Sequence, residues 1–172
     1  EEALLAARKA VEAAPSLALP HLREAMALSS LGRLDEAIGA ARRAVEAEPT
    51  SPRERCNLGL YLFRQNRMAE AEIELEKAIQ LDSGLFEPHY TLAGIYSRTG
   101  RLEEAVRLLE KCLDADPEGP KATEVRWFLA ELLLKKGTLA QAIEEKQAEI
   151  RGGERSTRKH LLCSILLLKA GR

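Results

Sequence analysis

One stretch of this sequence, a turn residue followed by an amphipathic helix, recurs along the chain at a nearly fixed interval. Its copies begin at Gly32, Asn66, Gly100, Gly137 and Gly171, so the steps between them are 34, 34, 37 and 34 residues. A period of about 20 to 50 residues is typical of repeat solenoids, whose units stack in a row and contact only their neighbours. The period therefore predicts a linear array of similar units instead of a globular domain with a single core.

The composition favours a folded chain and excludes several classes of partner. The 172 residues are 45% hydrophobic and 31% charged, as in ordinary soluble domains. The 26 Lys and Arg residues nearly balance the 27 Asp and Glu residues, so no basic excess favours nucleic acid or a membrane surface. No apolar run reaches the roughly 18 residues that a membrane-spanning helix needs. We therefore expect no nucleic-acid partner and no membrane insertion.

The start of the chain and its cysteines bear on its context. The sequence begins at Glu1, without Met and inside a repeat, so we expect a fragment of a longer protein. Its three cysteines lie in three different repeats and do not form a disulfide framework. This pattern favours a reducing compartment such as the cytoplasm.

Helical periodicity, glycine and proline together divide the chain into helices. Gly32 is expected to cap the helix before it in a left-handed conformation, which suits glycine. All seven prolines fall at a repeat junction or in the first turn of a helix, where a missing N–H does least harm. No stretch alternates for long enough to predict a strand. The expected helices cover residues 1–14, 20–31, 34–47, 52–65, 68–81, 86–99, 102–115, 121–136, 139–150 and 157–170.

These helices pair into a single all-α array over residues 1–172. Residues 1–17 correspond to the second helix of a partial repeat, and residues 157–172 to the first helix of a further one. Between them we expect four repeats, at residues 18–51, 52–85, 86–122 and 123–156.

The repeated unit resembles the tetratricopeptide repeat (TPR), a helix–turn–helix of about 34 residues. The third repeat carries the family's pattern of small and large residues at Leu92, Ala93, Tyr96, Ala105, Leu109, Cys112 and Pro117. The first repeat departs from it at Glu24, where a leucine would normally pack, and the fourth has Lys146 and Glu149 at small or apolar positions. The resemblance implies a right-handed superhelix of antiparallel helix pairs, whose first helices line a concave groove.

The resemblance also implies a binding function for that groove. In this family, positions two, five, nine and twelve of each first helix point into the concavity, and a partner peptide lies against them. The groove residues that we expect, with their neighbours, are Leu22, Met26, Cys56, Asn57, Leu60, Phe63, Arg64, Tyr90, Arg98, Trp127 and Glu131. Two alternatives stay open: Phe63 and Trp127 pack against the neighbouring repeat, or the cations at the helix ends only complement the helix dipole.

The sequence predicts no catalytic, cofactor or metal site. His21, His89 and His160 lie two repeats apart or more, too far for one metal ion. The paired carboxylates open helices, where they complement the dipole, and the glycines are caps. We therefore expect a protein-interaction module or scaffold and not an enzyme. The alternatives are a recognition arm of a larger protein, such as a glycosyltransferase or a secretion machine, and a scaffold that self-associates through its ends.

Overall fold

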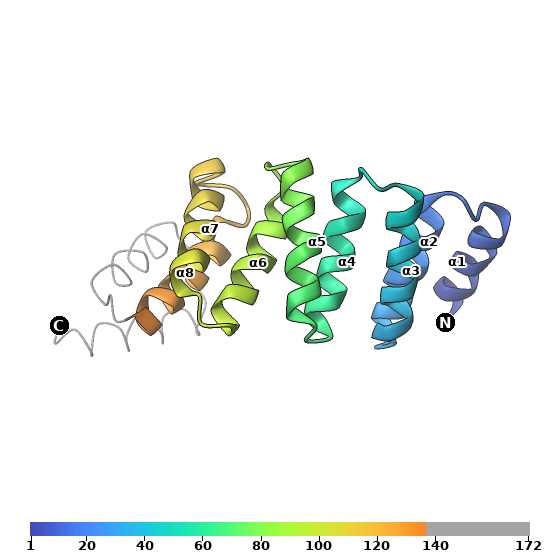
Figure 1. Cartoon of the computed structure of the whole chain (residues 1–172), viewed down its shortest axis with the longest axis horizontal. Helices are drawn as coiled ribbons and strands as arrows, with labels where there is room; N and C mark the ends of the chain where they lie inside the picture. The colour runs from blue at the N-terminus through green and yellow to red at the C-terminus, as the bar shows by residue number, and fades with distance from the viewer. Residues whose placement is uncertain (137–172) are drawn as a thin grey trace. The chain divides into compact units, whose positions relative to one another are not determined.

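A computed structural model describes residues 1–136 of the chain, and these fold as eight α-helices (Figure 1). The all-α prediction is confirmed, with the second helix of each described repeat at the expected bounds and the other helices within one or two residues of them. The expected helices at residues 139–150 and 157–170 lie outside the described residues. The helices are α1 (Glu2–Ala13), α2 (Ala18–Ser30), α3 (Leu34–Ala47), α4 (Pro52–Arg64), α5 (Met68–Leu81), α6 (Phe86–Arg98), α7 (Leu102–Ala115) and α8 (Ala122–Lys136).

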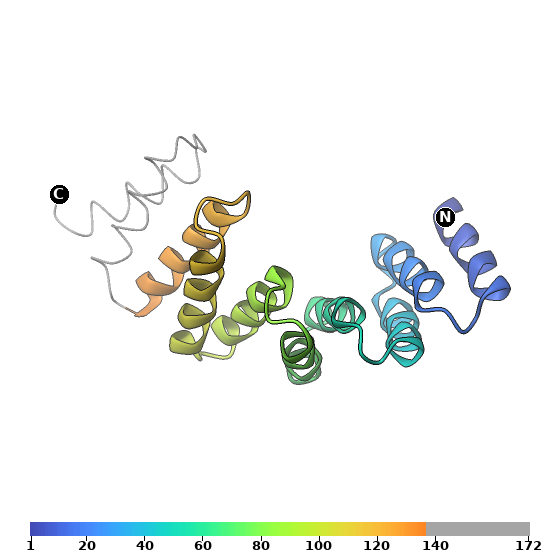
Figure 2. The same cartoon turned by 90° about the horizontal axis from the view of Figure 1, so that it is seen from above.

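The helices belong to two compact units, one over Glu1–Leu92 and one that begins at Ala93, with the boundary inside α6. In the first unit each helix packs against the next, from α1 to α5, and the connecting turns alternate between the two ends of the helices (Figures 1 and 2). The first helices of successive repeats, α2 and α4, also touch each other. In the second unit α7 packs against α8. This nearest-neighbour packing is the arrangement of a helical repeat.

The turn inside each repeat ends its first helix with a left-handed residue. Gly32 and Gly100 have φ angles of +76° and +82°, and Asn66 adopts +65° at the equivalent position. The next N–H then reaches back to a carbonyl of the last helical turn, as in a Schellman motif. These hydrogen bonds join Arg33 N to Leu28 O (3.0 Å), Arg67 N to Leu62 O (2.9 Å) and Arg101 N to Tyr96 O (2.8 Å). The predicted cap at Gly32 is confirmed.

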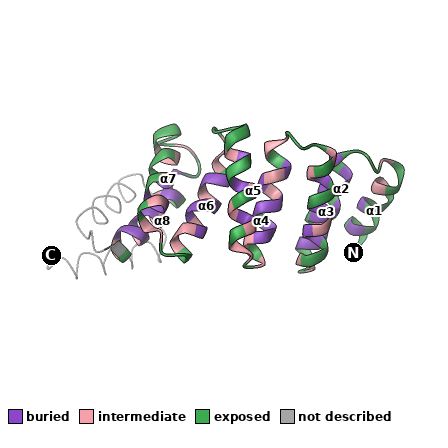
Figure 3. Cartoon of the chain, viewed as in Figure 1, coloured by how far each residue is buried: buried purple, intermediate pink, exposed green. Residues whose placement is uncertain are grey.

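Small residues let the two helices of a repeat approach closely, and the buried residues follow the contact faces of the helices (Figure 3). Gly59 on α4 is the tightest case, because a Cβ placed there would lie 2.6 Å from Leu75 Cγ on α5. Alanines that are fully buried occupy the equivalent positions of the other three repeats, at Ala25, Ala93 and Ala130. Close approach of the two helices therefore requires a small side chain at this position of each repeat.

A polar side chain near the start of each first helix holds the backbone of the loop that precedes it. His21 Nε2 donates to Pro15 O over 2.7 Å and His89 Nδ1 donates to Leu85 O over 2.7 Å. Arginine takes the same place in the other repeats, where Arg55 Nε donates to Pro49 O (2.9 Å) and Arg126 Nη2 to Pro117 O (2.6 Å). His21 and His89 thus have a structural role, whereas His160 lies outside the described residues.

Glu24, which departs from the family pattern, is buried between three helices. Its side chain is 9% exposed, and its carboxylate accepts from Arg8 Nε on α1 (3.4 Å) and from Arg43 Nη2 on α3 (3.0 Å). Arg43 Nε lies 3.5 Å from His21 Nδ1, which is free to accept because Nε2 donates to Pro15 O. Two ion pairs therefore replace the apolar contact that a leucine would make at this position.

Candidate functional site

An exposed stripe runs along each of the first helices α2 and α4. On both helices the stripe steps by four, three and four residues, a spacing that keeps side chains on one helical face. Each α2 member has its α4 counterpart 34 residues later. We call these eight residues the first-helix face: Leu19, Arg23, Met26 and Ser30 on α2, and Arg53, Asn57, Leu60 and Arg64 on α4.

The first-helix face exposes apolar side chains. Leu19 is 49% exposed, Met26 is 53% exposed and Leu60 is 36% exposed. Since α2 and α4 touch, and Arg64 Nη1 donates to Ser29 Oγ across them, the two stripes lie side by side. Adjacent exposed apolar side chains of this kind mark candidate interaction sites.

The charge of the first-helix face is positive. It contains Arg23, Arg53 and Arg64 and no acidic residue. The side chains of Arg23 and Arg53 make no hydrogen bond or ion pair within residues 1–136. The two acidic residues nearest along the helices are turned inward, since Glu24 binds arginines of α1 and α3 and Glu54 accepts from Ser51 Oγ. The face therefore offers free cations beside exposed apolar groups.

The stripe shares positions two and nine with the expected groove positions, but has positions six and thirteen in place of five and twelve. Leu22 is 1% exposed and packs with Ala18 and Ala44, and Cys56 is also buried. At position twelve, Ser29 is 4% exposed and accepts the bond from Arg64. In the first repeat these positions are covered because α2 packs against α3 and also touches α4. Leu22 and Cys56 thus belong to the core and present almost no surface.

The other expected residues differ in exposure. Met26, Leu60, Arg64 and Arg98 are exposed, and Asn57 and Phe63 are half-buried. Tyr90 on α6 is half-buried and stacks on Phe86, with ring centroids 5.4 Å apart. Trp127 and Glu131 on α8 are half-buried.

The basic residues near the ends of the first helices join neighbouring helices. Lys135 Nζ on α8 lies 3.4 Å from Ser97 Oγ on α6, and this contact matches the one between Arg64 and Ser29 two repeats earlier. Both cations remain exposed. They bridge successive first helices while part of each charge still faces solvent, so the structural and the ligand-binding interpretations are compatible.

The sequence prediction missed Leu19, Arg23 and Arg53, which lie on the first-helix face. The 34-residue repeat contains the signal that finds them. Leu19 and Arg53 occupy position two of their repeats, and Arg23 occupies position six, which is also the position of Asn57. A helical wheel centred on Met26 and Leu60 would have included all three.

Three local environments shift pKa values. The hydrogen bond from Arg33 lowers the pKa of Glu36, with Nε 2.6 Å from Oε1. Burial raises the pKa of Tyr61, and the charge of Arg64 opposes that shift. Burial also raises the pKa of the Cys112 thiol. A thiol with a raised pKa holds less of the thiolate that nucleophilic chemistry needs.

Two other kinds of site find no support among residues 1–136. No helix in this range is long and apolar enough to cross a membrane. Within the same range no three His, Cys, Asp or Glu side chains lie in an arrangement that could hold a metal ion.

Comparisons with known proteins agree with the repeat pattern. One tetratricopeptide-repeat family model matches residues 22–85 and 90–156, and a second matches residues 54–118. No catalytic family is among these matches. A search of curated protein sequences finds no significant match.

Solved structures with the same fold include the following three proteins. The structure of Pseudomonas aeruginosa PilF is 25% identical, with a TM-score of 0.82 over 96% of this chain and 74% of that one. YrrB, described as a TPR protein with an unusual peptide-binding site, is 19% identical, with a TM-score of 0.77 over 96% of this chain and 84% of its own. MamA from Desulfovibrio magneticus RS-1 is 19% identical, with a TM-score of 0.79 over 88% and 84% of the two chains. The repeat pattern, the antiparallel helix pairs and the two family matches together establish that this chain belongs to the tetratricopeptide repeat family.

Proposed function

We propose that this chain is a protein-interaction module that binds a peptide segment of another protein on its first-helix face. The observation that carries the proposal is the alternation of exposed Leu19, Met26 and Leu60 with arginines on two adjacent helices. Met and Arg side chains are enriched at protein interfaces, and Arg is common among the residues that carry most of the binding energy. YrrB, which has a similar fold, is described as having a peptide-binding site, and this favours the same class of ligand.

The charge of the face selects the chemistry of the peptide. Arg23 and Arg53 have no acidic partner among the described residues, so a ligand carboxylate would find two available guanidinium groups. Charge-assisted hydrogen bonds to arginine are strong and directional because the guanidinium group presents a planar fork of donors. The preferred segment therefore combines Asp or Glu with leucine-like side chains.

The corresponding helices α6 and α8 extend the proposal beyond the first two repeats. Arg98 occupies the position of Arg64, and Glu131 occupies that of Met26 and Leu60. Tyr90 and Trp127 share position five, and both retain some exposed surface. We propose these four residues as peptide contacts on their own helices.

Selection from a random 12-residue peptide display library on the immobilised chain tests the proposal. We expect enrichment of peptides that carry both acidic and large apolar residues. The double variant Arg23→Glu, Arg53→Glu should lose at least tenfold in affinity for a selected peptide, because two attractive contacts become repulsive. Arg107→Glu, a charge reversal at an exposed position of α7, is the matched control and should change the affinity by less than twofold.

A second double variant tests whether the binding site extends to α6. Tyr90→Ala with Arg98→Ala is expected to weaken binding of the selected peptide and to leave the melting temperature nearly unchanged. Full-strength binding by this variant would restrict the site to α2 and α4. Selected peptides without acidic residues, or equal losses in Arg107→Glu and the arginine double variant, would refute the proposed first-helix site.

A further inference from the structure

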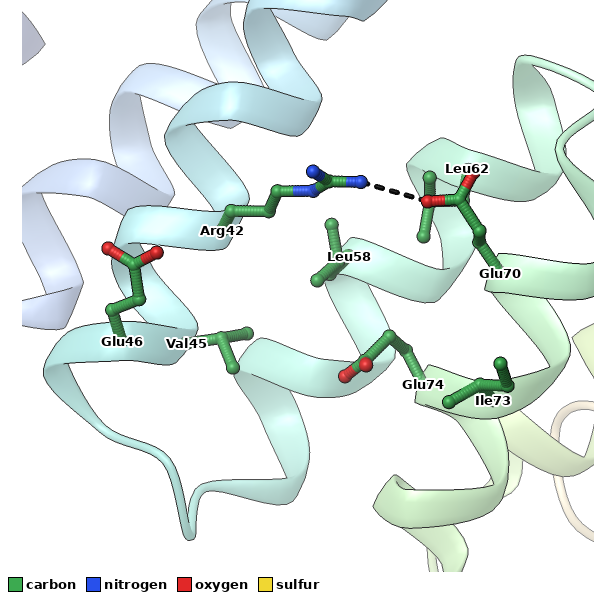
Figure 4. A pocket seen from close by; sticks show the side chains of 8 residues that line it. All are labelled: Arg42, Val45, Glu46, Leu58, Leu62, Glu70, Ile73 and Glu74. Carbon is green, nitrogen blue, oxygen red and sulfur yellow. Dashed lines mark hydrogen bonds and ion pairs between the residues drawn. The ribbon is translucent and has the colours of Figure 1, made fainter.

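A pocket of about 350 Å³ lies between the second helices α3 and α5, with α4 beneath it (Figure 4). Both second helices pack against α4. At one side Arg42 reaches from α3 to Glu70 on α5, with Nη2 and Oε2 2.9 Å apart. The pocket is lined by Arg42, Val45 and Glu46 of α3, Leu58 and Leu62 of α4, and Glu70, Ile73 and Glu74 of α5.

The inside of this pocket is apolar. Leu58 and Leu62 are 5% and 1% exposed, so they present only their outer atoms at the base. Val45 lines it from α3, and Ile73 lines it from α5 with 51% of its surface exposed. A volume of this size is at the lower end of the range for ligand pockets and suits one or two side chains.

The rim of the pocket carries charged side chains, most of them in ion pairs. Three of its residues are glutamates and one is an arginine. Glu70 is engaged by Arg42 and Arg67, and Glu74 is engaged by Arg55 and Lys77.

Glu46 differs from the other two glutamates of the rim. Within residues 1–136 it makes no ion pair and no hydrogen bond, and it is exposed beside the apolar base. The pocket therefore combines a hydrophobic floor with one carboxylate, that of Glu46, that is available to a ligand.

We propose that this pocket is a second docking site, which binds a basic, apolar segment of a partner protein. A leucine-like side chain of the segment inserts against Leu58 and Leu62, and an adjacent lysine or arginine pairs with Glu46. The apolar contact supplies the affinity, whereas the charge selects a cationic segment and steers its approach. The proposal goes beyond binding on the first-helix face, since the ligand has the opposite charge.

The two sites use different sides of α4. Successive residues of an α-helix are rotated by about 100°, since there are 3.6 residues per turn. Leu58 and Leu62 therefore lie about 200° around the helix from Leu60, which belongs to the first-helix face. One segment can occupy the pocket while another lies on the first-helix face, so the chain is able to join two partners.

Binding of three fluorescein-labelled peptides of equal length tests the second site. The first contains leucine flanked by lysines, the second contains leucine flanked by glutamates, and the third contains serine flanked by lysines. Fluorescence anisotropy is expected to detect binding of the leucine–lysine peptide but not of the serine–lysine peptide. The leucine–glutamate peptide suits the first-helix face and should not compete with the leucine–lysine peptide. In a methyl NMR spectrum of the same titration, the δ1 methyl signal of Ile73 should shift.

Paired variants locate the binding. Glu46→Lys should weaken the leucine–lysine peptide at least tenfold, whereas Glu12→Lys, the same change at an exposed position of α1, should alter its affinity by less than twofold. Ile73→Ser should weaken it at least fivefold, and Leu5→Ser, at a site 59% exposed on α1, should not. Circular dichroism of each variant confirms that the helices are retained.

Other outcomes would overturn the second site. They are equal losses in Glu46→Lys and Glu12→Lys, equal binding of all three peptides, or an Ile73 methyl signal that stays in place. The double variant Arg23→Glu, Arg53→Glu should keep its affinity for the leucine–lysine peptide. Failure of the first-helix proposal and failure of the second site are therefore separate results.

Discussion

Replacement of Glu24 by leucine tests how a buried charge is tolerated in this array. The equivalent residues of the other repeats are leucines that are 2% to 5% exposed, at Leu58, Leu92 and Leu129. Glu24→Leu removes contacts with Arg8 and Arg43, whose side chains are 46% and 48% exposed and return easily to water.

The magnitude follows from these exposures. Two ion pairs with half-exposed arginines contribute at most about 1 kcal/mol each. Burial of a leucine side chain stabilises the folded state by about 1.5 to 3 kcal/mol. The free-energy cost of removing the Glu24 carboxylate from water also disappears. We therefore expect the free energy of unfolding of Glu24→Leu to stay unchanged or to rise by up to about 2 kcal/mol.

Removing a partner and keeping the charge should have the opposite effect. Arg43→Ala leaves Glu24 with Arg8 alone, at 3.4 Å, and should lower the free energy of unfolding by about 1 to 2 kcal/mol. In the Glu24→Leu background the same change should cost less than about 0.5 kcal/mol, since no buried carboxylate remains.

Urea unfolding of the full chain, followed by circular dichroism, gives the free energy of unfolding of the unchanged chain, Glu24→Leu, Arg43→Ala and the double variant. The four are compared at a constant m-value. Glu12→Leu, at an exposed position of α1, is the control and should change the free energy of unfolding by no more than about 0.5 kcal/mol. The reasoning is refuted if Glu24→Leu lowers the free energy of unfolding by more than about 1 kcal/mol, or if Arg43→Ala costs the same in both backgrounds.

Three further predictions concern packing, turns and pH. Gly59→Ala should lower the free energy of unfolding by about 1 kcal/mol, because the clash with Leu75 outweighs the gain in helix propensity, and Leu75→Val should restore part of the loss in a urea titration. Asn66→Ala should lower it by about 1 kcal/mol because of the left-handed backbone, whereas Asn66→Gly should not lower it in the same assay. Burial raises the pKa of the Cys112 thiol, so the thiol ionises at a lower pH in the unfolded chain than in the folded one, and stability should fall as the pH rises above about 8.5. In melting curves, Cys112→Ala should reduce the fall of the melting temperature with pH.

Local rules account for the parts of the fold that the sequence predicts well. The second helices are predicted at both ends because a left-handed turn such as Gly32 precedes each and a junction residue such as Pro49 follows. These signals lie within a few residues of the boundary that they determine, so no knowledge of the neighbouring repeats is needed.

The candidate site depends on contacts that the sequence does not contain. Leu22 fits the expected groove position, but its burial is decided by α3 and by the neighbouring first helix. Glu24 is paired with Arg8 and Arg43, which come from helices on either side in the chain, 16 and 19 residues away. The repeat pattern predicts which helices pack together, but the rotation of each helix depends on the side chains of both neighbours.

The loop anchors at the start of the first helices have a consequence for how the chain tolerates insertions. Arg126 reaches Pro117 O across nine residues, whereas Arg55 and Pro49 are six apart, so the same anchor persists although this junction is three residues longer. The extra residues lie between the two ends of the anchor and leave α7 with 14 residues, the same length as α3 and α5. Junctions that are held by a hydrogen bond from one side chain can lengthen in evolution without a shift in the packing of the helices. The segment after Pro117 is therefore a suitable place to insert a new loop.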